Sequence, residues 1–110
     1  MYKDNIQLFK YRAEILKSLS HPVRLAIVDL LKDDEKCVCD IVDFLEEKQS
    51  SVSRHLAMLR SAGIVETRKE GLQVYYRLNA PCVNVFLNCV DRIIRERHEE
   101  KGKALKNIQA

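Results

Sequence analysis

The sequence predicts a mainly α-helical domain with one β-hairpin, in the order α-α-α-α-β-β-α. Apolar residues recur at helical spacing in four segments before Gly63, and the spacing changes to strand-like alternation after it. Helical spacing then returns after Pro81. A length of 110 residues fits one domain, so we expect residues 1–110 to form a single unit.

The four leading helices are marked by their apolar faces and by their ends. Pro22 suits the first position of a helix, with Ser20 or His21 as the capping residue before it. Gly63 is expected to end the fourth helix, because glycine adopts the left-handed conformation that commonly follows a helix. The expected helices cover residues 5–19, 22–32, 38–46 and 50–62.

A hairpin and a last helix complete the chain. Strands are expected over 64–68 and 73–78, joined by a turn over 69–72, and a long helix over about 82–100 precedes a basic tail from Lys101. The third and fourth helices are joined by a short connection, which makes a helix-turn-helix, and a hairpin directly after such a pair is a wing. We therefore predict a winged helix-turn-helix.

The fourth helix begins with an unusual cluster of short polar and basic side chains. Such side chains are poor formers of a helix interior, but they suit a helix whose start faces phosphates and base edges in a DNA groove. Cations also outnumber acids locally between residues 49 and 77. We interpret this as a DNA-binding surface, with a solvated helix and hairpin as the alternative. The cluster consists of Ser50, Ser51, Ser53, Arg54 and His55.

Composition bounds the remaining function classes. The net charge of +3 permits a nucleic-acid partner, and no apolar run approaches the roughly 18 residues of a membrane span. The charged N-terminus does not resemble a signal peptide, so we expect a cytoplasmic protein with no membrane partner. No nucleophile–base set or phosphate loop is present, so we expect neither an enzyme nor a tightly bound cofactor.

Cys37 and Cys39 stand at the expected start of the third helix. Residues i and i+2 point about 200° apart on a regular helix, so the thiols converge only if Cys37 lies outside it or the first turn unwinds. We expect a disulfide between them to be strained in a helix. Thiolates select As(III), Sb(III), Cd(II), Pb(II), Zn(II) or Cu(I). The alternative is that both are small apolar core residues.

Three segments, SHPVRLAIVDLL, CVCDI and SxSRHLAxLRxAGIVxxRKEGxxVYYRL, together resemble the ArsR/SmtB family of metal-responsive winged-helix repressors. The resemblance spans about residues 6–95. It implies a homodimer built on helices at about 1–19 and 81–100, which binds inverted-repeat operator DNA and is released by an inducer. It also implies DNA contacts by Gln49, Ser50, Ser53, Arg54 and His55, and by Arg68, Lys69 and Gln73 on the wing.

The chain departs from the family's metal sites. Arsenic sensors of this type carry a third cysteine where this chain has Val42, and its N-terminal arm lacks the cysteines that cadmium and lead sensors use. The third ligand is therefore open. Cys82 and Cys89 lie on one stripe of the last helix and are further candidate ligands. The alternative is that both are buried residues of the dimer interface. The leading hypothesis is a repressor released by a thiophilic metal or metalloid; the alternative is a redox- or persulfide-sensing repressor of the same fold.

Overall fold

The structure, a computed structural model, describes residues 1–98. It divides into a compact unit over Met1–Ala80 and a second unit that begins at Pro81, and each unit is considered by itself below. The basic tail expected over 101–110, and the last residues of the expected final helix, lie outside the described residues.

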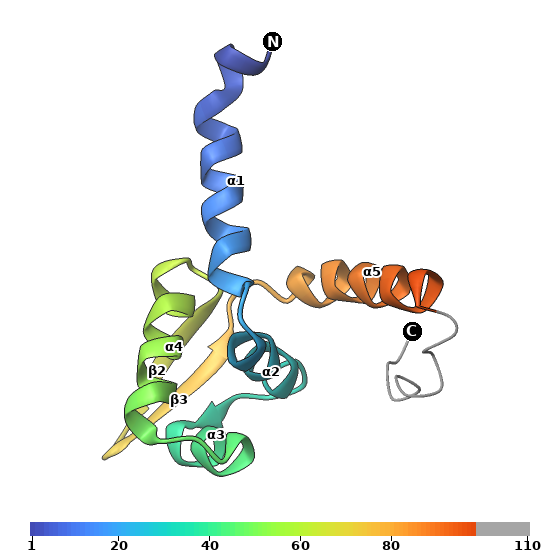
Figure 1. Cartoon of the computed structure of the whole chain (residues 1–110). Helices are drawn as coiled ribbons and strands as arrows, with labels where there is room; N and C mark the ends of the chain where they lie inside the picture. The colour runs from blue at the N-terminus through green and yellow to red at the C-terminus, as the bar shows by residue number, and fades with distance from the viewer. Residues whose placement is uncertain (99–110) are drawn as a thin grey trace. The chain divides into compact units, whose positions relative to one another are not determined.

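The helices of the first unit confirm the predicted order (Figure 1). His21, rather than Ser20, caps α2: its Nδ1 accepts a hydrogen bond of 3.1 Å from the Val23 amide, and Pro22 takes the first helical position. Gly63 follows α4 with a φ of 80°, as expected of a residue that ends a helix. A short 3-10 helix before α1 was not expected. The bounds are η1 Tyr2–Asn5, α1 Ile6–Leu19, α2 Pro22–Leu30, α3 Val38–Leu45 and α4 Gln49–Ser61.

The wing is part of a three-stranded antiparallel sheet with the order β1-β3-β2. The hairpin strands are β2 (Val65–Glu70) and β3 (Gln73–Leu78), so the turn shortens to two residues, and Gly71 takes a φ of 62° at its first position. This is the position where a two-residue hairpin turn of type II′ favours glycine. The third strand, β1 (Lys36–Cys37), was not predicted, because two residues carry no periodicity.

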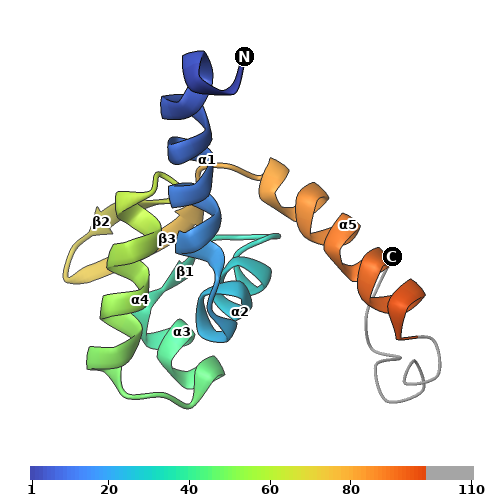
Figure 2. The same cartoon turned by 45° about the horizontal axis from the view of Figure 1, so that its top comes forward.

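The core of the first unit lies where α2, α3, α4 and β2 meet (Figure 2). Burying one such aliphatic side chain contributes roughly 1.5–3 kcal/mol relative to exposing it. Since Val52, Leu56 and Leu59 are all buried, α4 is held by one face, and most of its other side chains are left at the surface. The fully buried side chains are Ile27, Val28, Ile41, Val52, Leu56, Leu59, Ile64 and Val65.

Several helices keep apolar side chains at the surface, among them α1 and α5. On α1, Phe9 and Leu16 are exposed, and on α5 (Cys82–Arg97), which has no buried residue, Phe86 and Ile93 are exposed. The role of these helices in dimerisation stays a prediction. Among the described residues, the structure contains no helix that is both long and apolar enough to cross a membrane.

Candidate functional site

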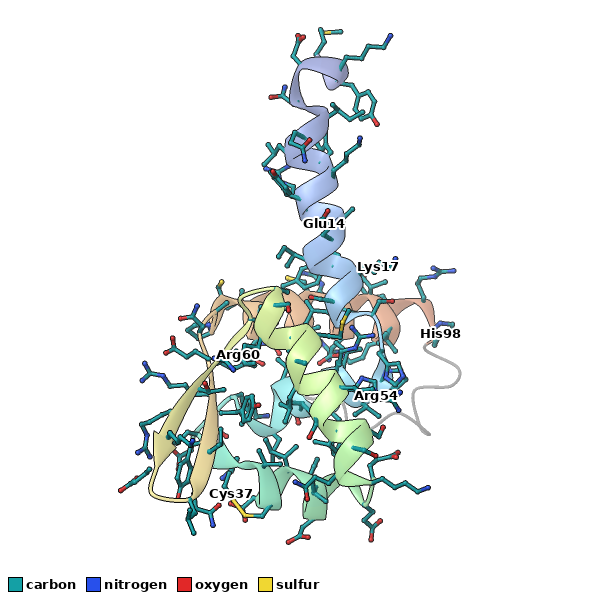
Figure 3. All side chains as sticks on the ribbon, turned by 90° about the vertical axis from the view of Figure 1, so that its left-hand side faces the viewer. Glu14, Lys17, Cys37, Arg54, Arg60 and His98 are labelled. Carbon is teal, nitrogen blue, oxygen red and sulfur yellow. A yellow bond between two sulfur atoms is a disulfide. The ribbon has the colours of Figure 1, made fainter. Side chains whose placement is uncertain are left out.

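The first turns of α4 present the polar cluster to solvent. Gln49, Ser50, Ser53 and Arg54 are exposed, and no side chain caps the helix start at Lys48. The first amides of a helix have no partner within the helix, so they can donate to an anion such as a phosphate. Figure 3 shows Arg54 on this helix, with Cys37 at the start of α3. The surface of α4 therefore has the side chains and the amides that a DNA groove requires.

Two other members of the cluster, Ser51 and His55, are half-buried. The His55 ring lies 4.3 Å from the ring of His21, centroid to centroid, between α4 and the start of α2. Burial lowers the pKa of His55, and the positive charges of Arg24 and Arg54 lower it further. His55 is therefore a neutral residue at the junction of two helices at neutral pH, and its contact with DNA stays a prediction.

On the wing, Arg68 is already paired. Its Nε donates to Glu35 Oε2 at 3.3 Å, a second guanidinium nitrogen donates to Glu35 Oε1, and a third donates to Glu70 Oε2 at 2.6 Å. Its guanidinium also lies 4.7 Å from the centre of the Tyr75 ring. These pairs raise the pKa of Arg68 and lower that of Glu35. Arg68 is thus tied to the residues that precede Cys37.

The other residues predicted on the wing, Lys69 and Gln73, are exposed. Glu70 pairs with Gln73 across the hairpin, so Gln73 is the first residue of β3 after the turn. Another wing cation, Arg77, pairs with Glu66. The wing therefore presents Lys69 and Gln73 to solvent, while both of its arginines are held by carboxylates.

Cys37 lies between the sheet and α3. It pairs with Tyr75 of β3, and it is the N-cap of α3, where its Sγ accepts a hydrogen bond of 3.3 Å from the Asp40 amide. Its φ of −76° and ψ of 161° are those of extended backbone, so Cys37 stands outside the helix. This is one of the two arrangements in which the sequence allowed the thiols to converge.

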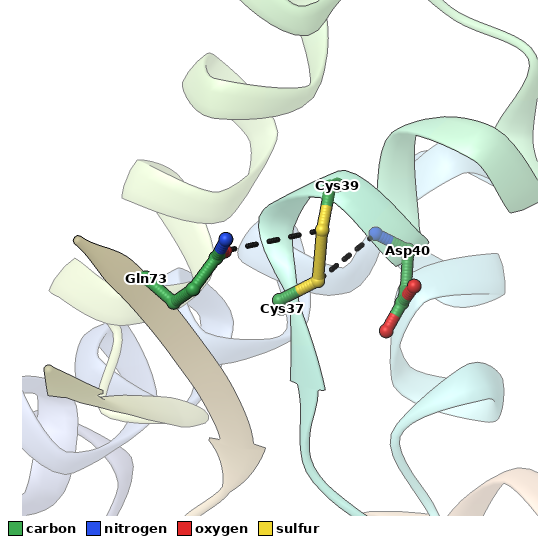
Figure 4. Close-up of a disulfide and its surroundings, with 4 residues drawn as sticks. All are labelled: Cys37, Cys39, Asp40 and Gln73. Carbon is green, nitrogen blue, oxygen red and sulfur yellow. Dashed lines mark hydrogen bonds between the residues drawn. A yellow bond between two sulfur atoms is a disulfide. The ribbon is translucent and has the colours of Figure 1, made fainter. Parts of the chain in front are cut away.

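Cys37 and Cys39 are joined by a disulfide, with their Cα atoms 5.3 Å apart (Figure 4). A bond between these two was expected to be strained in a helix, but only Cys39 lies in α3, whereas Cys37 belongs to β1 and has extended backbone.

Two residues beside the cysteines were not predicted as part of this site. A carboxylate oxygen of Asp40 and the two sulfur atoms all lie within 4.8 Å of one another. From the wing, Gln73 Oε1 lies 4.0 Å from Cys39 Sγ (Figure 4). A disulfide sulfur carries no hydrogen, so only the reduced Cys39 thiol could donate to Gln73. The sequence could have indicated Asp40, because it directly follows the CVC motif. It could not have indicated Gln73, because that residue comes from a distant strand.

The remaining cysteines, Cys82 and Cys89, are free and exposed on α5, in the second unit. Their participation in the site of Cys37 and Cys39 stays a prediction.

The chain is similar to known regulators over most of its length. Residues 21–67 match the arsR family of bacterial regulatory proteins. The arsenical resistance operon repressor of Escherichia coli K12 is 35% identical over 96 residues, which cover 86% of this chain and 82% of that protein.

Two solved structures share both the sequence and the fold. Reduced HlyU from Vibrio cholerae has a TM-score of 0.73 and 32% identity, covering 84% of this chain and 97% of that one. The homodimeric winged helix-turn-helix DNA-binding domain of a Mycobacterium bovis protein has a TM-score of 0.73 and 31% identity, covering 86% of each chain. Together with the exposed first turns of α4 and the hairpin that follows it, these similarities show that the chain belongs to the ArsR family of bacterial DNA-binding transcriptional regulators, which is not a family of enzymes.

Proposed function

We propose that this chain is a transcriptional repressor that binds an inverted-repeat operator as a homodimer and is released when a thiophilic metal or metalloid binds Cys37 and Cys39. One observation carries the proposal: Cys37 pairs with β3 of the wing and also caps α3, the helix before α4. A change in the state of this thiol therefore reaches the wing directly, and it reaches α4 through α3, which packs against α4.

The DNA contacts are assigned to the exposed side chains of α4 and the wing. Arg54 and Lys69 suit phosphates, and Gln49 and Gln73 suit base edges or phosphates. Affinity that rests on such cations falls steeply with salt, because binding releases counterions from the DNA.

The apolar side chains exposed on α1 and α5 support a homodimer. A chain of 110 residues has a limited core of its own, and a second copy would cover these stripes. A dimer with two-fold symmetry presents two copies of α4, which is why the operator is expected to be an inverted repeat.

The inducer is assigned to the reduced cysteines. Each thiol loses a proton to solvent as its bond to the metal forms, and the candidates are As(III), Sb(III), Cd(II), Pb(II) and Zn(II). If the metal-bound conformation binds DNA more weakly, then by linkage the metal releases the operator.

The test is operator release by the reduced protein. An operator is first selected from random DNA, and binding is then followed by fluorescence anisotropy as each ion is added. We expect at least one ion to release the DNA from the parent protein, and Cys37→Ser and Cys39→Ser to bind the operator without responding. Release that is unchanged in both variants, or absent with every ion, would refute the assignment.

DNA binding is tested separately by charge removal. Arg54→Ala should lower operator affinity about tenfold or more, and the loss should shrink at high salt. Lys32→Ala is the matched control, because Lys32 is an exposed cation just after α2 and is not one of the residues expected to contact DNA. Equal affinities for the two variants would remove Arg54 from the DNA surface.

A second candidate signal is oxidation, which the disulfide between Cys37 and Cys39 favours. The two thiols would give two protons and two electrons to a peroxide as the sulfur–sulfur bond forms. Hydrogen peroxide is reduced to two waters, and an organic hydroperoxide to an alcohol and a water. If peroxide alone releases the operator from the reduced protein, the repressor senses oxidants and the metal assignment is wrong.

A further inference from the structure

We infer that Asp40 and Gln73 complete the metal site, so that two thiolates, one carboxylate oxygen and one amide oxygen bind a divalent thiophilic cation of the Zn(II) or Cd(II) type. The inference rests on the proposed function, since it concerns the same cysteines. Arsenic sensors of this type carry a third cysteine where this chain has Val42. The inference assigns the missing donors to the neighbouring helix residue Asp40 and to Gln73 of the wing.

The distances allow these atoms to share one ion. The Asp40 oxygen and both sulfurs lie within 4.8 Å of one another, and Gln73 Oε1 lies 4.0 Å from Cys39 Sγ. Donors bound to Zn(II) at about 2.0–2.3 Å lie roughly 3.5 Å from each other in a tetrahedron. After reduction, the two sulfurs, which are bonded to each other here, must therefore separate, and the Asp40 oxygen must approach them. Rotation of the exposed Cys39 and Asp40 side chains can supply both changes.

Burial fits a site that is anchored on one side and open on the other. Cys37 is 6% exposed and is held by the Asp40 amide, whereas Cys39, Asp40 and Gln73 are exposed. The ion can thus enter from solvent, and the three exposed side chains can close around it. The thiols bind in the reduced form, so the disulfide and the metal-bound state exclude each other.

The donor set discriminates between ions. Two thiolates fall short of the three that As(III) prefers, and carboxylate and amide oxygens are harder donors that suit a divalent cation. Two thiolates and one carboxylate carry a charge of −3, which a divalent cation offsets to −1. We therefore expect Cd(II) and Zn(II) to depend on Asp40 and Gln73, and As(III) not to depend on them.

Gln73 would give the site a direct connection to DNA binding. It is the first residue of β3 after the hairpin turn, and it is one of the residues expected to contact DNA. An ion that holds the Gln73 amide oxygen against α3 withdraws this side chain from DNA. Metal and operator would then compete for one side chain, which is a source of negative coupling between the two ligands.

The test measures metal binding by the reduced full-length protein, with operator release as a separate readout. Cd(II) is titrated under anaerobic conditions and followed by thiolate-to-cadmium charge-transfer absorbance, while As(III) is titrated in parallel. We expect Asp40→Asn to weaken Cd(II) binding about tenfold or more, and Gln73→Ala to weaken it by a smaller factor. Gln73→Glu should strengthen it, because a carboxylate keeps the oxygen donor and adds charge.

The matched control is Asp43→Asn, which makes the same charge change at an exposed position one turn further along α3. It should bind Cd(II) like the parent. If Asp40→Asn also binds like the parent, Asp40 is not a ligand, and an unchanged affinity in Gln73→Ala removes the wing from the site. Loss of As(III) binding in either variant would overturn the assigned selectivity.

Cadmium NMR gives an independent readout, because the chemical shift reports the number of sulfur donors. A shift typical of two sulfurs supports the inference, and a shift typical of three or four would overturn it in favour of Cys82 or Cys89. These outcomes would overturn the ligand assignment but not the proposed function. In each of them, Cys37→Ser and Cys39→Ser still abolish metal-driven release. Normal release in both serine variants would instead refute the metal function itself.

Discussion

Cys37 has a structural role that is separable from its chemistry, and this leads to a quantitative prediction. Its Sγ accepts the Asp40 amide at the start of α3, and its side chain is 6% exposed. Cys39, two residues later, is exposed and is not the cap of the helix. Replacing each cysteine by alanine in the reduced protein should therefore have very different effects on stability.

The magnitude follows from two contributions. Loss of an N-cap acceptor costs about 1 kcal/mol, and removal of one buried atom the size of a methylene costs about 1 kcal/mol more. Cys37→Ala should therefore lower the free energy of unfolding by about 2 kcal/mol. Cys37→Ser keeps an acceptor for the Asp40 amide, so its loss should be about 1 kcal/mol. Cys39→Ala should stay within about 0.5 kcal/mol of the parent, as expected of an exposed position.

The assay is urea and thermal unfolding of the reduced proteins. Protein concentration is held fixed, because the stability of a dimer depends on it. At about 4 °C per kcal/mol for a domain of this size, the melting temperature of Cys37→Ala should fall by about 8 °C. The reasoning is refuted if Cys37→Ala and Cys39→Ala have the same free energy of unfolding, or if Cys37→Ser is no more stable than Cys37→Ala.

Three further predictions concern the wing, pH and α4. Glu35→Gln should remove one of the two carboxylates that hold Arg68, so operator affinity should rise and its log–log salt slope should steepen by at most about one, whereas the control Asp33→Asn should leave the slope unchanged. The pKa of His55 is lowered from 6.5, so the unfolded chain binds protons more readily and stability falls as the pH drops below 6.5. The variant His55→Gln should flatten the dependence of the melting temperature on pH across that range. Gly63→Ala should lower the free energy of unfolding by about 1 kcal/mol in urea titration, because φ is 80° there.

The elements that the sequence predicted well are those specified by neighbouring residues. Pro22 and Gly63 mark a helix start and a helix end, and both hold these positions in the structure. Helical spacing placed α2, α3 and α4 within a few residues of their bounds, and alternation placed the hairpin. These signals are local, since helical hydrogen bonds and side-chain faces depend on residues only a few positions apart.

The wing shows where local signals end. Its strands were predicted, but β1 was not, because Lys36 and Cys37 form a strand only by pairing with Tyr76 and Tyr75. The ion pair between Glu35 and Arg68 was missed for the same reason, as its partners are 33 residues apart. The count of charges along the chain therefore overstated the number of unpaired cations on the wing, since packing decides which charges pair.

By itself, the sequence determined the winged helix-turn-helix, the polar start of α4 and the presence of two thiols at the start of α3. Only the tertiary structure decided what these thiols face. Pairing with β3 draws Cys37 out of the helix into extended backbone, so its sulfur reaches Cys39. The same sheet brings Gln73 beside Cys39 across 34 residues of sequence. The physical reason is that strand pairing joins distant segments through backbone hydrogen bonds, which no pattern of neighbouring side chains specifies.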